Sequence, residues 1–191
     1  MTNQAPSERT RWRIHGERLV DENPHIRLSI ASVELPDGTH FDQYVFRMPR
    51  CVMTVVLDEP GERILLIWRH RFIMDQWDWE VPGGYLDQGE DGPAGAAREV
   101  EEETGWRPRN IKFLLSFQPA IGSADAPQDV YVAHGADLVG EPEVDEAETV
   151  RWVPIDEAQE MIRRGEILGA STVIAVMHAA AERAASPSHR T

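Results

Sequence analysis

The chain has 191 residues, of which 41% are hydrophobic and 27% are charged, and its formal net charge at pH 7 is −14. This composition is typical of a soluble globular protein, and the length suffices for one well-buried domain but hardly for two. The acidic balance argues against nucleic acids and anionic membranes as partners, because both attract clustered Lys and Arg.

The N-terminal residues and the single cysteine bear on the compartment. The first twelve residues, MTNQAPSERTRW, lack the apolar core of a signal peptide, and no apolar run approaches the roughly 18–20 residues that span a bilayer. Cys51 heads an apolar run and has no second cysteine to pair with, so we expect a buried thiol rather than a nucleophile. The sequence predicts a cytoplasmic protein.

The N-terminal quarter of the chain has the pattern of β-strands. The predicted strands are Arg13–Val20, Arg27–Leu35 and His40–Arg47. The second and third are joined by a Pro-Asp-Gly-Thr turn at 36–39. After Ile30 the apolar alternation slips by one residue, which predicts a β-bulge in the second strand. We expect an antiparallel N-terminal extension at 11–48 that could serve dimerisation, with flexible tails at 1–10 and 185–191.

Short apolar runs after residue 50 predict a buried sheet followed by two helices. Val52–Leu57 and Arg63–Ile67 read as the central hairpin of that sheet. Further strands are predicted at Trp79–Pro82, Ile111–Phe117, Val130–His134 and Thr149–Val153. The closing helices are predicted at Asp156–Arg164, ended by Gly165, and at Ser171–Glu182, capped by Ser171. Strands mixed with helices indicate an α/β (α+β) domain at 49–184, with a mixed sheet covered by helices.

A further helix is predicted in the middle of the chain, at Pro93–Thr104. Proline suits the first helical position, Asp91 or Gly92 can cap the N-terminus, and Gly105 fits the site where the helix ends.

Three acids of this helix share one face. Glu99, Glu102 and Glu103 stand at i, i+3 and i+4, near the helix C-terminus, where negative charge is disfavoured. A hard divalent cation such as Mg2+, which takes carboxylate oxygens, would make this arrangement favourable. A solvated acidic face is the alternative for such a run considered alone.

The residues around the acids follow a longer pattern, GYLDQGEDGPAGAAREVEEETGW at 84–106. It has Gly84, then Glu90, then Arg98-Glu99-Val100, then Glu102-Glu103 and Gly105-Trp106 at fixed spacing. This resembles the signature of the Nudix hydrolases at nine specified positions, with Trp106 where an aliphatic residue is more usual. The resemblance implies the Nudix fold, an α/β/α sandwich.

The resemblance also implies roles for the signature residues. Glu99, Glu102 and Glu103 would bind Mg2+, or Mn2+ as a substitute, with the carbonyl of Gly83 as a further ligand. The remaining motif residues would be structural, and among them Glu90 and Arg98 would form an ion pair that ties the preceding loop to the helix. The other structural positions are Gly84 and Gly105.

Outside the signature, LIWRHRF at 66–72 and WEVPGG at 79–84 resemble a stretch of the ADP-ribose pyrophosphatases and related nucleotide-sugar hydrolases. By that resemblance Arg71 would approach the diphosphate, Arg69 stands where glutamine is usual, and Glu80 lies near the metals. Trp12 and Phe41 are candidates to stack on a nucleobase, since aromatic rings provide contact area at little entropic cost. In this subfamily the N-terminal strands commonly support a homodimer.

A general base is expected in an acidic loop downstream, by the same resemblance. Glu146 in EPEVDEAE at 141–148 matches best, with Glu148 second, and Glu102 could act instead. One departure concerns the substrate: ADP-ribose hydrolases carry a Pro-Gly pair beyond the signature, whereas here Pro119 and Gly122 are separated.

These features predict a Mg2+-dependent pyrophosphohydrolase of a nucleoside diphosphate linked to another moiety, first ADP-ribose, cleaved to AMP and ribose 5-phosphate. Another nucleotide sugar, a dinucleoside polyphosphate or a CDP-alcohol is the alternative substrate. A ligand-binding regulator without catalysis and a structural protein with an acidic surface are the alternatives from other classes.

Overall fold

The computed structural model describes residues 8–142 and 147–185, which form two compact units. The first unit contains the N-terminal segment to Pro49 together with 120–126, and the second contains the rest. No helix in the described part of the chain is long and apolar enough to cross a membrane.

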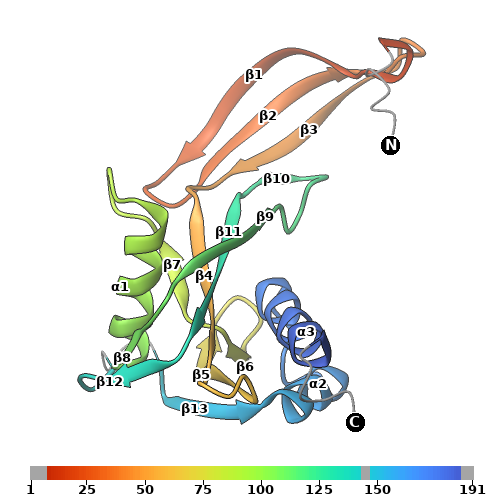
Figure 1. Ribbon diagram of the computed structural model, residues 1–191. Coiled ribbons are helices and arrows are strands. Elements are labelled where there is room, and N and C mark those ends of the chain that lie inside the picture. Colours follow the sequence, from red (N-terminus) through yellow and green to blue (C-terminus); the bar gives the residue numbers. More distant parts are fainter. Residues whose placement is uncertain (1–7, 143–146, 186–191) are drawn as a thin grey trace. The chain divides into compact units, whose positions relative to one another are not determined.

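The first unit is a four-stranded sheet in the order β1-β2-β3-β10 (Figure 1). Its strands are β1 (Arg13–Glu22), β2 (Arg27–Glu34), β3 (His40–Arg47) and β10 (Ala124–Asp125), preceded by the 3-10 helix η1 (Glu8–Thr10). The three predicted antiparallel strands are present, and Gly38 allows the β2–β3 turn because it adopts a φ of 85°. Sequence analysis did not predict β10, which adds to β3 in parallel from a distant part of the chain.

The predicted bulge is in a different strand. Pairing of β2 with β3 is continuous, and β2 keeps a strict alternation, with Ser29, Ala31 and Val33 buried. The register shifts lie between β1 and β2, where β1 has an extra residue after Ile14 and another after Leu19. The apparent slip in β2 arose because apolar side chains occupy both of its faces, so hydrophobicity alone did not reveal the strand period.

The second unit is built on a mixed sheet in the order β13-β5-β4-β11-β9. β11 pairs with β4 in parallel, and the other pairs are antiparallel. β6 pairs with β5, β7 pairs with β4, and β8 and β12 form a separate ribbon. The strands are β4 (Cys51–Leu57), β5 (Arg63–Arg71), β6 (Gln76–Glu80), β7 (Gly83–Tyr85), β8 (Trp106–Pro108), β9 (Lys112–Phe117), β11 (Gln128–His134), β12 (Ala136–Leu138) and β13 (Thr149–Pro154).

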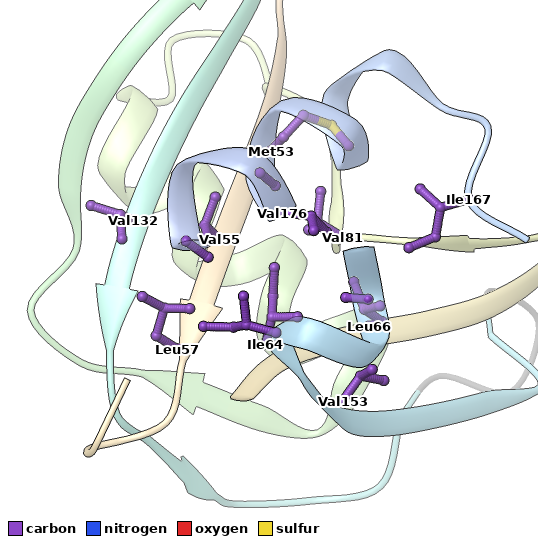
Figure 2. Packing of buried hydrophobic residues seen from close by; sticks show 14 of the residues in the cluster. Met53, Val55, Leu57, Ile64, Leu66, Val81, Val132, Val153, Ile167 and Val176 are labelled. Carbon is purple, nitrogen blue, oxygen red and sulfur yellow. The ribbon is translucent and has the colours of Figure 1, made fainter. Parts of the chain in front are cut away.

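Three helices cover this sheet and make an α/β/α sandwich, which confirms the predicted fold class (Figure 1). They are α1 (Gly92–Thr104), α2 (Ile155–Arg164) and α3 (Ala170–Ala185). Alternate residues of β4 serve the two layers: Met53, Val55 and Leu57 pack in the cluster with α2 and α3 (Figure 2), whereas Val52 and Val56 pack with α1. Because helices lie on both faces, this strand is apolar throughout.

Local signals account for both ends of α1 and for the C-terminus of α2. The Asp91 side chain caps α1 by accepting a hydrogen bond from the Ala94 N–H at 3.2 Å, and Gly105 ends it with a φ of 72°. Gly165 ends α2 in the same way. The prediction that Ser171 caps the last helix is wrong, because α3 starts at Ala170 and the Ser171 hydroxyl donates to the side chain of Gln128.

Two strands run further than predicted. β5 continues four residues beyond Ile67 to Arg71, and β6 begins at Gln76 rather than at Trp79 and ends at Glu80. These added residues pair with each other as an antiparallel hairpin. Their side chains are mostly polar or exposed, so no apolar pattern marked them as strand.

Candidate active site

The acidic face of α1 is the centre of the site. Glu103 is buried at 3% exposure, Glu99 is mostly buried, and the Glu102 side chain is partly exposed. One oxygen of Glu99 and one of Glu102 accept hydrogen bonds from the same Arg98 nitrogen, Nη1, at 2.9 and 2.8 Å. Arg98 therefore holds two of the three carboxylates, and the Arg98–Glu102 contact is the i, i+4 pair that a helix brings together.

Arg98 also joins α1 to the loop before it. Its Nε and Nη2 donate to the two oxygens of Glu90, both at 2.9 Å, and Nη2 donates to the carbonyl of Tyr85 at 3.1 Å. The Glu90 bonds chiefly raise the pKa of Arg98, and Arg98 in turn lowers the pKa of Glu90. This forked geometry requires a planar guanidinium, because a lysine ammonium cannot reach the same set of oxygens.

Glu103 has different hydrogen-bond partners from Glu99 and Glu102. Its Oε2 accepts the Gly83 N–H at 2.8 Å, and Oε1 pairs with Arg69. Burial raises the pKa of Glu103 to about 7, and the neighbouring charge of Glu99 contributes to the rise, although Arg69 and the Gly83 N–H oppose it. The site thus contains a carboxylate that is poorly solvated and attracts positive charge.

Two glycines permit the close approach of β7 to α1 and β4. A side chain on Gly84 would place its Cβ 2.5 Å from Oε2 of Glu99. A Cβ on Gly83 would overlap the carbonyl oxygen of Val52 and the side chain of Met53. Only glycine fits these positions without displacing a carboxylate or the central strand.

The β5–β6 hairpin supplies the basic side of the site. In its register Ile67 stands opposite Glu80 and Arg69 opposite Asp78, so alternate side chains from both strands share a face. Arg71 donates through Nε to Glu80 at 2.6 Å and through Nη2 to the other Glu80 oxygen. This pairing raises the pKa of Arg71.

A cavity of about 680 Å³ opens between these groups. It is lined by the acids of α1, by the β5–β6 side chains Arg69, Arg71 and Glu80, by Gly83 and Gly84, and by the start of α3. Cys51 also lines it, but burial raises the pKa of its thiol to about 12, so the sulfur stays protonated and is not a nucleophile.

The donor set suits a divalent metal. Three carboxylates at one wall offer the oxygen ligands that hard cations prefer, and Gly84 leaves room for Glu99 to lie against the backbone. Arg98 Nη1 bonds to two of these carboxylates, and Arg69 pairs with the third.

The residues that line this cavity do not include every predicted one. Trp12 and Phe41 belong to the N-terminal unit, where their rings form a T-shaped pair with centroids 5.9 Å apart. Glu146 lies outside the described residues. Glu148 is exposed and does not line the cavity, and its N–H donates to the carbonyl of Trp68 at 2.9 Å.

Sequence reasoning missed other residues of the cavity wall. Ser171 donates to the Gln128 side chain at 2.6 Å, and Thr172 accepts the Val81 N–H at 3.1 Å, which joins α3 to the strands around the cavity. Asp78 lines a neighbouring pocket rather than this cavity; it is 4% exposed and accepts the N–H groups of Leu168 and Gly169 at 2.9 and 3.2 Å. The hairpin register could have revealed Asp78, whereas the α3 contacts are separated by long stretches of sequence.

Clustered carboxylates with arginines across an open cavity are the arrangement expected of a hydrolase that handles phosphoanhydrides with a divalent metal. Residues 47–170 match the family model described as NUDIX domain, and the chain belongs to the Nudix family. It is a Nudix hydrolase that acts on the phosphoanhydride bond of nucleoside diphosphate-linked small molecules.

Two curated relatives extend over most of the chain. A CMP-5'-(N-acetyl-N-hydroxy-3-aminopropyl)phosphonate hydrolase of Streptomyces rubellomurinus is 47% identical over 168 residues, which cover 87% of this chain and 81% of that protein. An ADP-ribose pyrophosphatase of Mycobacterium tuberculosis is 33% identical over 149 residues, covering 76% and 72%. The crystal structure of an ADP compounds hydrolase superposes with a TM-score of 0.77 at 18% identity, covering 94% and 97%, and shares the fold.

Proposed function

We propose that this protein is a Mg2+-dependent hydrolase, with Mn2+ as a substitute metal, that separates a nucleoside monophosphate from a second phosphorus-containing moiety. The observation that carries the proposal is the triad Glu99, Glu102 and Glu103 on one face of α1, at the wall of a cavity that also presents arginines. The gathered carboxylates would hold cations, and the arginines would receive substrate oxygens.

The chain's own residues support distinct parts of this reaction. Arg98 and Glu90 hold α1 and its loop together, and Gly83 and Gly84 let the carboxylates approach the strand. Bound to the three glutamates, the metal would neutralise phosphate oxygens and lower the pKa of a water molecule. Arg71 is half-exposed at the cavity and would exchange part of its pairing with Glu80 for a phosphate oxygen.

Water attack requires a group that accepts its proton. We assign this role to Glu146 in the acidic stretch at 141–148. Glu102 is the alternative, because its partly exposed side chain lines the cavity. The new bond joins the water oxygen to one phosphorus, and the bridging P–O bond breaks to release the other group as its oxyanion. Glu146→Gln and Glu102→Gln are compared by their pH–rate profiles, and the variant that loses the low-pH limb while still binding metal identifies the base.

Two substrate classes are favoured by specific observations. Identity of 47% to a hydrolase of a CMP-linked phosphonate favours a cytidylyl phosphonate or similar CMP-linked compound. The ADP-ribose pyrophosphatase relative favours ADP-ribose, but the separation of Pro119 and Gly122 departs from the usual pattern of that group. We therefore place the CMP-linked class first and ADP-ribose second.

A substrate panel tests this order. The full chain is assayed with Mg2+ on a CMP-linked phosphonate, a CDP-alcohol, ADP-ribose, another nucleotide sugar and a dinucleoside polyphosphate, with release of the nucleoside monophosphate as readout. The highest kcat/KM is expected for the CMP-linked phosphonate, and hydrolysis in 18O-labelled water identifies the phosphorus that is attacked. Binding of ADP-ribose with no turnover of any compound would instead indicate a regulator.

A homodimer and a cytoplasmic location complete the proposal. The N-terminal sheet exposes large apolar side chains, including Trp12, Ile14 and Tyr44, as a dimer-forming sheet would. Sedimentation equilibrium of the purified chain tests the dimer, and a monomer across the micromolar range would refute it.

A further inference from the structure

A second set of metal-ligating side chains lies in the N-terminal unit, away in sequence from the Nudix signature. His15, Glu34 and His40 come from β1, β2 and β3, and each offers one ligand atom within 4.8 Å of the others. In the described part of the chain this is the one group of three or more histidine, cysteine or acidic residues with ligand atoms so close together.

Strand pairing explains why these side chains meet. Glu34 stands directly opposite His40 in the β2–β3 register, so both project from the same face of the sheet. His15 is the extra residue of the β1 bulge, because Ile14 pairs with Val33 and Gly16 pairs with Ser32. Arg13 pairs with Glu34, and strand alternation puts His15, two residues further along, on the face that carries Glu34 and His40.

The contacts already resemble those of a ligand cluster. His15 Nε2 lies 2.6 Å from Glu34 Oε2, and the rings of His15 and His40 have centroids 5.4 Å apart. The His15 ring is 48% exposed and therefore has space to rotate.

The donor types select the class of metal. Two imidazoles with one carboxylate suit Zn2+ and neighbouring transition metals, whereas Mg2+ prefers oxygen ligands throughout. With Zn–N and Zn–O distances near 2.0–2.2 Å, two tetrahedral ligands stand about 3.3 Å apart. The atoms of this cluster, between 2.6 and 4.8 Å apart, reach that spacing by small side-chain rotations.

We propose that His15, Glu34 and His40 bind one divalent transition-metal ion of the zinc class, in addition to the cations of the Nudix carboxylates. The ion would connect three adjacent strands of the N-terminal sheet and leave a coordination position for water. The alternative is that the three side chains bind no metal and that His15 and Glu34 keep only the hydrogen bond between them.

Zinc titration of the 191-residue chain distinguishes metal binding from the hydrogen bond alone. Metal-stripped protein is titrated calorimetrically with Zn2+ at neutral pH in excess Mg2+, which competes at the α1 carboxylates. One equivalent of Zn2+ is expected for the wild type, with affinity lowered about 10–100-fold or more in His15→Gln and in His40→Gln, because each loses one ligand. The matched control is His25→Gln, in the β1–β2 turn, whose backbone N–H bond to Asn23 does not involve the ring.

Co2+ substitution gives a readout that does not depend on variants. Two paramagnetically shifted imidazole N–H signals are expected in the NMR spectrum of the wild type and of His25→Gln. If a variant fails to show the native far-ultraviolet circular dichroism, Glu34→Gln replaces it, since that change removes a ligand but keeps the size of the side chain. Equal Zn2+ affinity in the wild type and the double variant His15→Gln/His40→Gln, or no shifted imidazole signals, would overturn the proposal.

Discussion

Replacing Glu103 by glutamine is expected to reduce catalysis and, in the metal-free protein, to increase stability. Glu103 is 3% exposed, and burial raises its pKa from 4.5 to about 7 despite its contacts with Arg69 and the Gly83 N–H. The ionised side chain is therefore less stable in the folded protein than in water, and it is retained for a reason other than folding.

The pKa shift sets the size of the stability effect. A rise from 4.5 to about 7 corresponds to about 3 kcal/mol at 1.36 kcal/mol per pKa unit. Because the folded pKa is the higher one, the folded state binds more protons between these values, and wild-type stability falls as pH rises from 4.5 to 7. Glutamine avoids this cost but leaves Arg69 without its anionic partner, so we expect a net gain of about 1–2 kcal/mol above pH 7.

Activity should change in the opposite direction. Loss of a metal-binding carboxylate removes several kcal/mol of transition-state stabilisation, which corresponds to a decrease of at least about 100-fold in kcat. The measurements are urea unfolding in a chelating agent at several pH values and initial rates in Mg2+. The matched control is Glu101→Gln, since Glu101 lies on the same helix but pairs with the exposed Arg107. Near-normal rates of the Glu103→Gln variant, or a free energy of unfolding of this variant that still falls between pH 4.5 and 7 as in the wild type, would refute the reasoning.

Three further changes test the supporting structure. Gly84→Ala places a Cβ 2.5 Å from a Glu99 oxygen. It should raise the Mg2+ concentration for half-maximal rate at least tenfold while leaving the circular dichroism unchanged. An unchanged metal requirement would argue against the close approach of Glu99 to the backbone of residue 84. The lysine of Arg98→Lys cannot maintain the hydrogen bonds to Glu90 and to the acids of α1. The free energy of unfolding should therefore fall by about 1–3 kcal/mol in urea titrations. A smaller loss would show that these hydrogen bonds contribute little to stability. The hydrogen bond from Arg47 on β3 is the main cause that lowers the pKa of Glu17 from 4.5 to about 2. The stabilisation by Glu17 is therefore full above pH 4.5 and is lost as the pH falls towards 2. Glu17→Gln should remove up to about 1 kcal/mol of this pH dependence in acid unfolding titrations, and an unaltered dependence of stability on pH would contradict the prediction.

Local sequence determined the parts of the fold that depend on neighbouring residues. The acidic helix was predicted to within one residue, because its Asp91 cap, its proline and Gly105 act within one or two turns. The β3 bounds also match the prediction, since alternation and the preceding turn are local signals. The spacing of Glu99, Glu102 and Glu103 already placed the three acids on one helical face.

Longer-range pairing decided what local patterns could not. The polar ends of β5 and β6 are strands only because they pair with each other, and this hairpin sets Arg69 against Glu103 and Arg71 against Glu80. β10 joins β3 across more than seventy residues of sequence, and no apolar run announced it.

The sequence by itself therefore determined the family, the sandwich and the acidic helix, because each rests on residues at fixed local spacing. Only the tertiary structure decided which cation pairs with which carboxylate, and it alone brought His15 to Glu34 and His40 through the pairing of three strands. The physical reason is that a strand register is a relation between distant segments, and a shift of one residue moves every side chain to the other face.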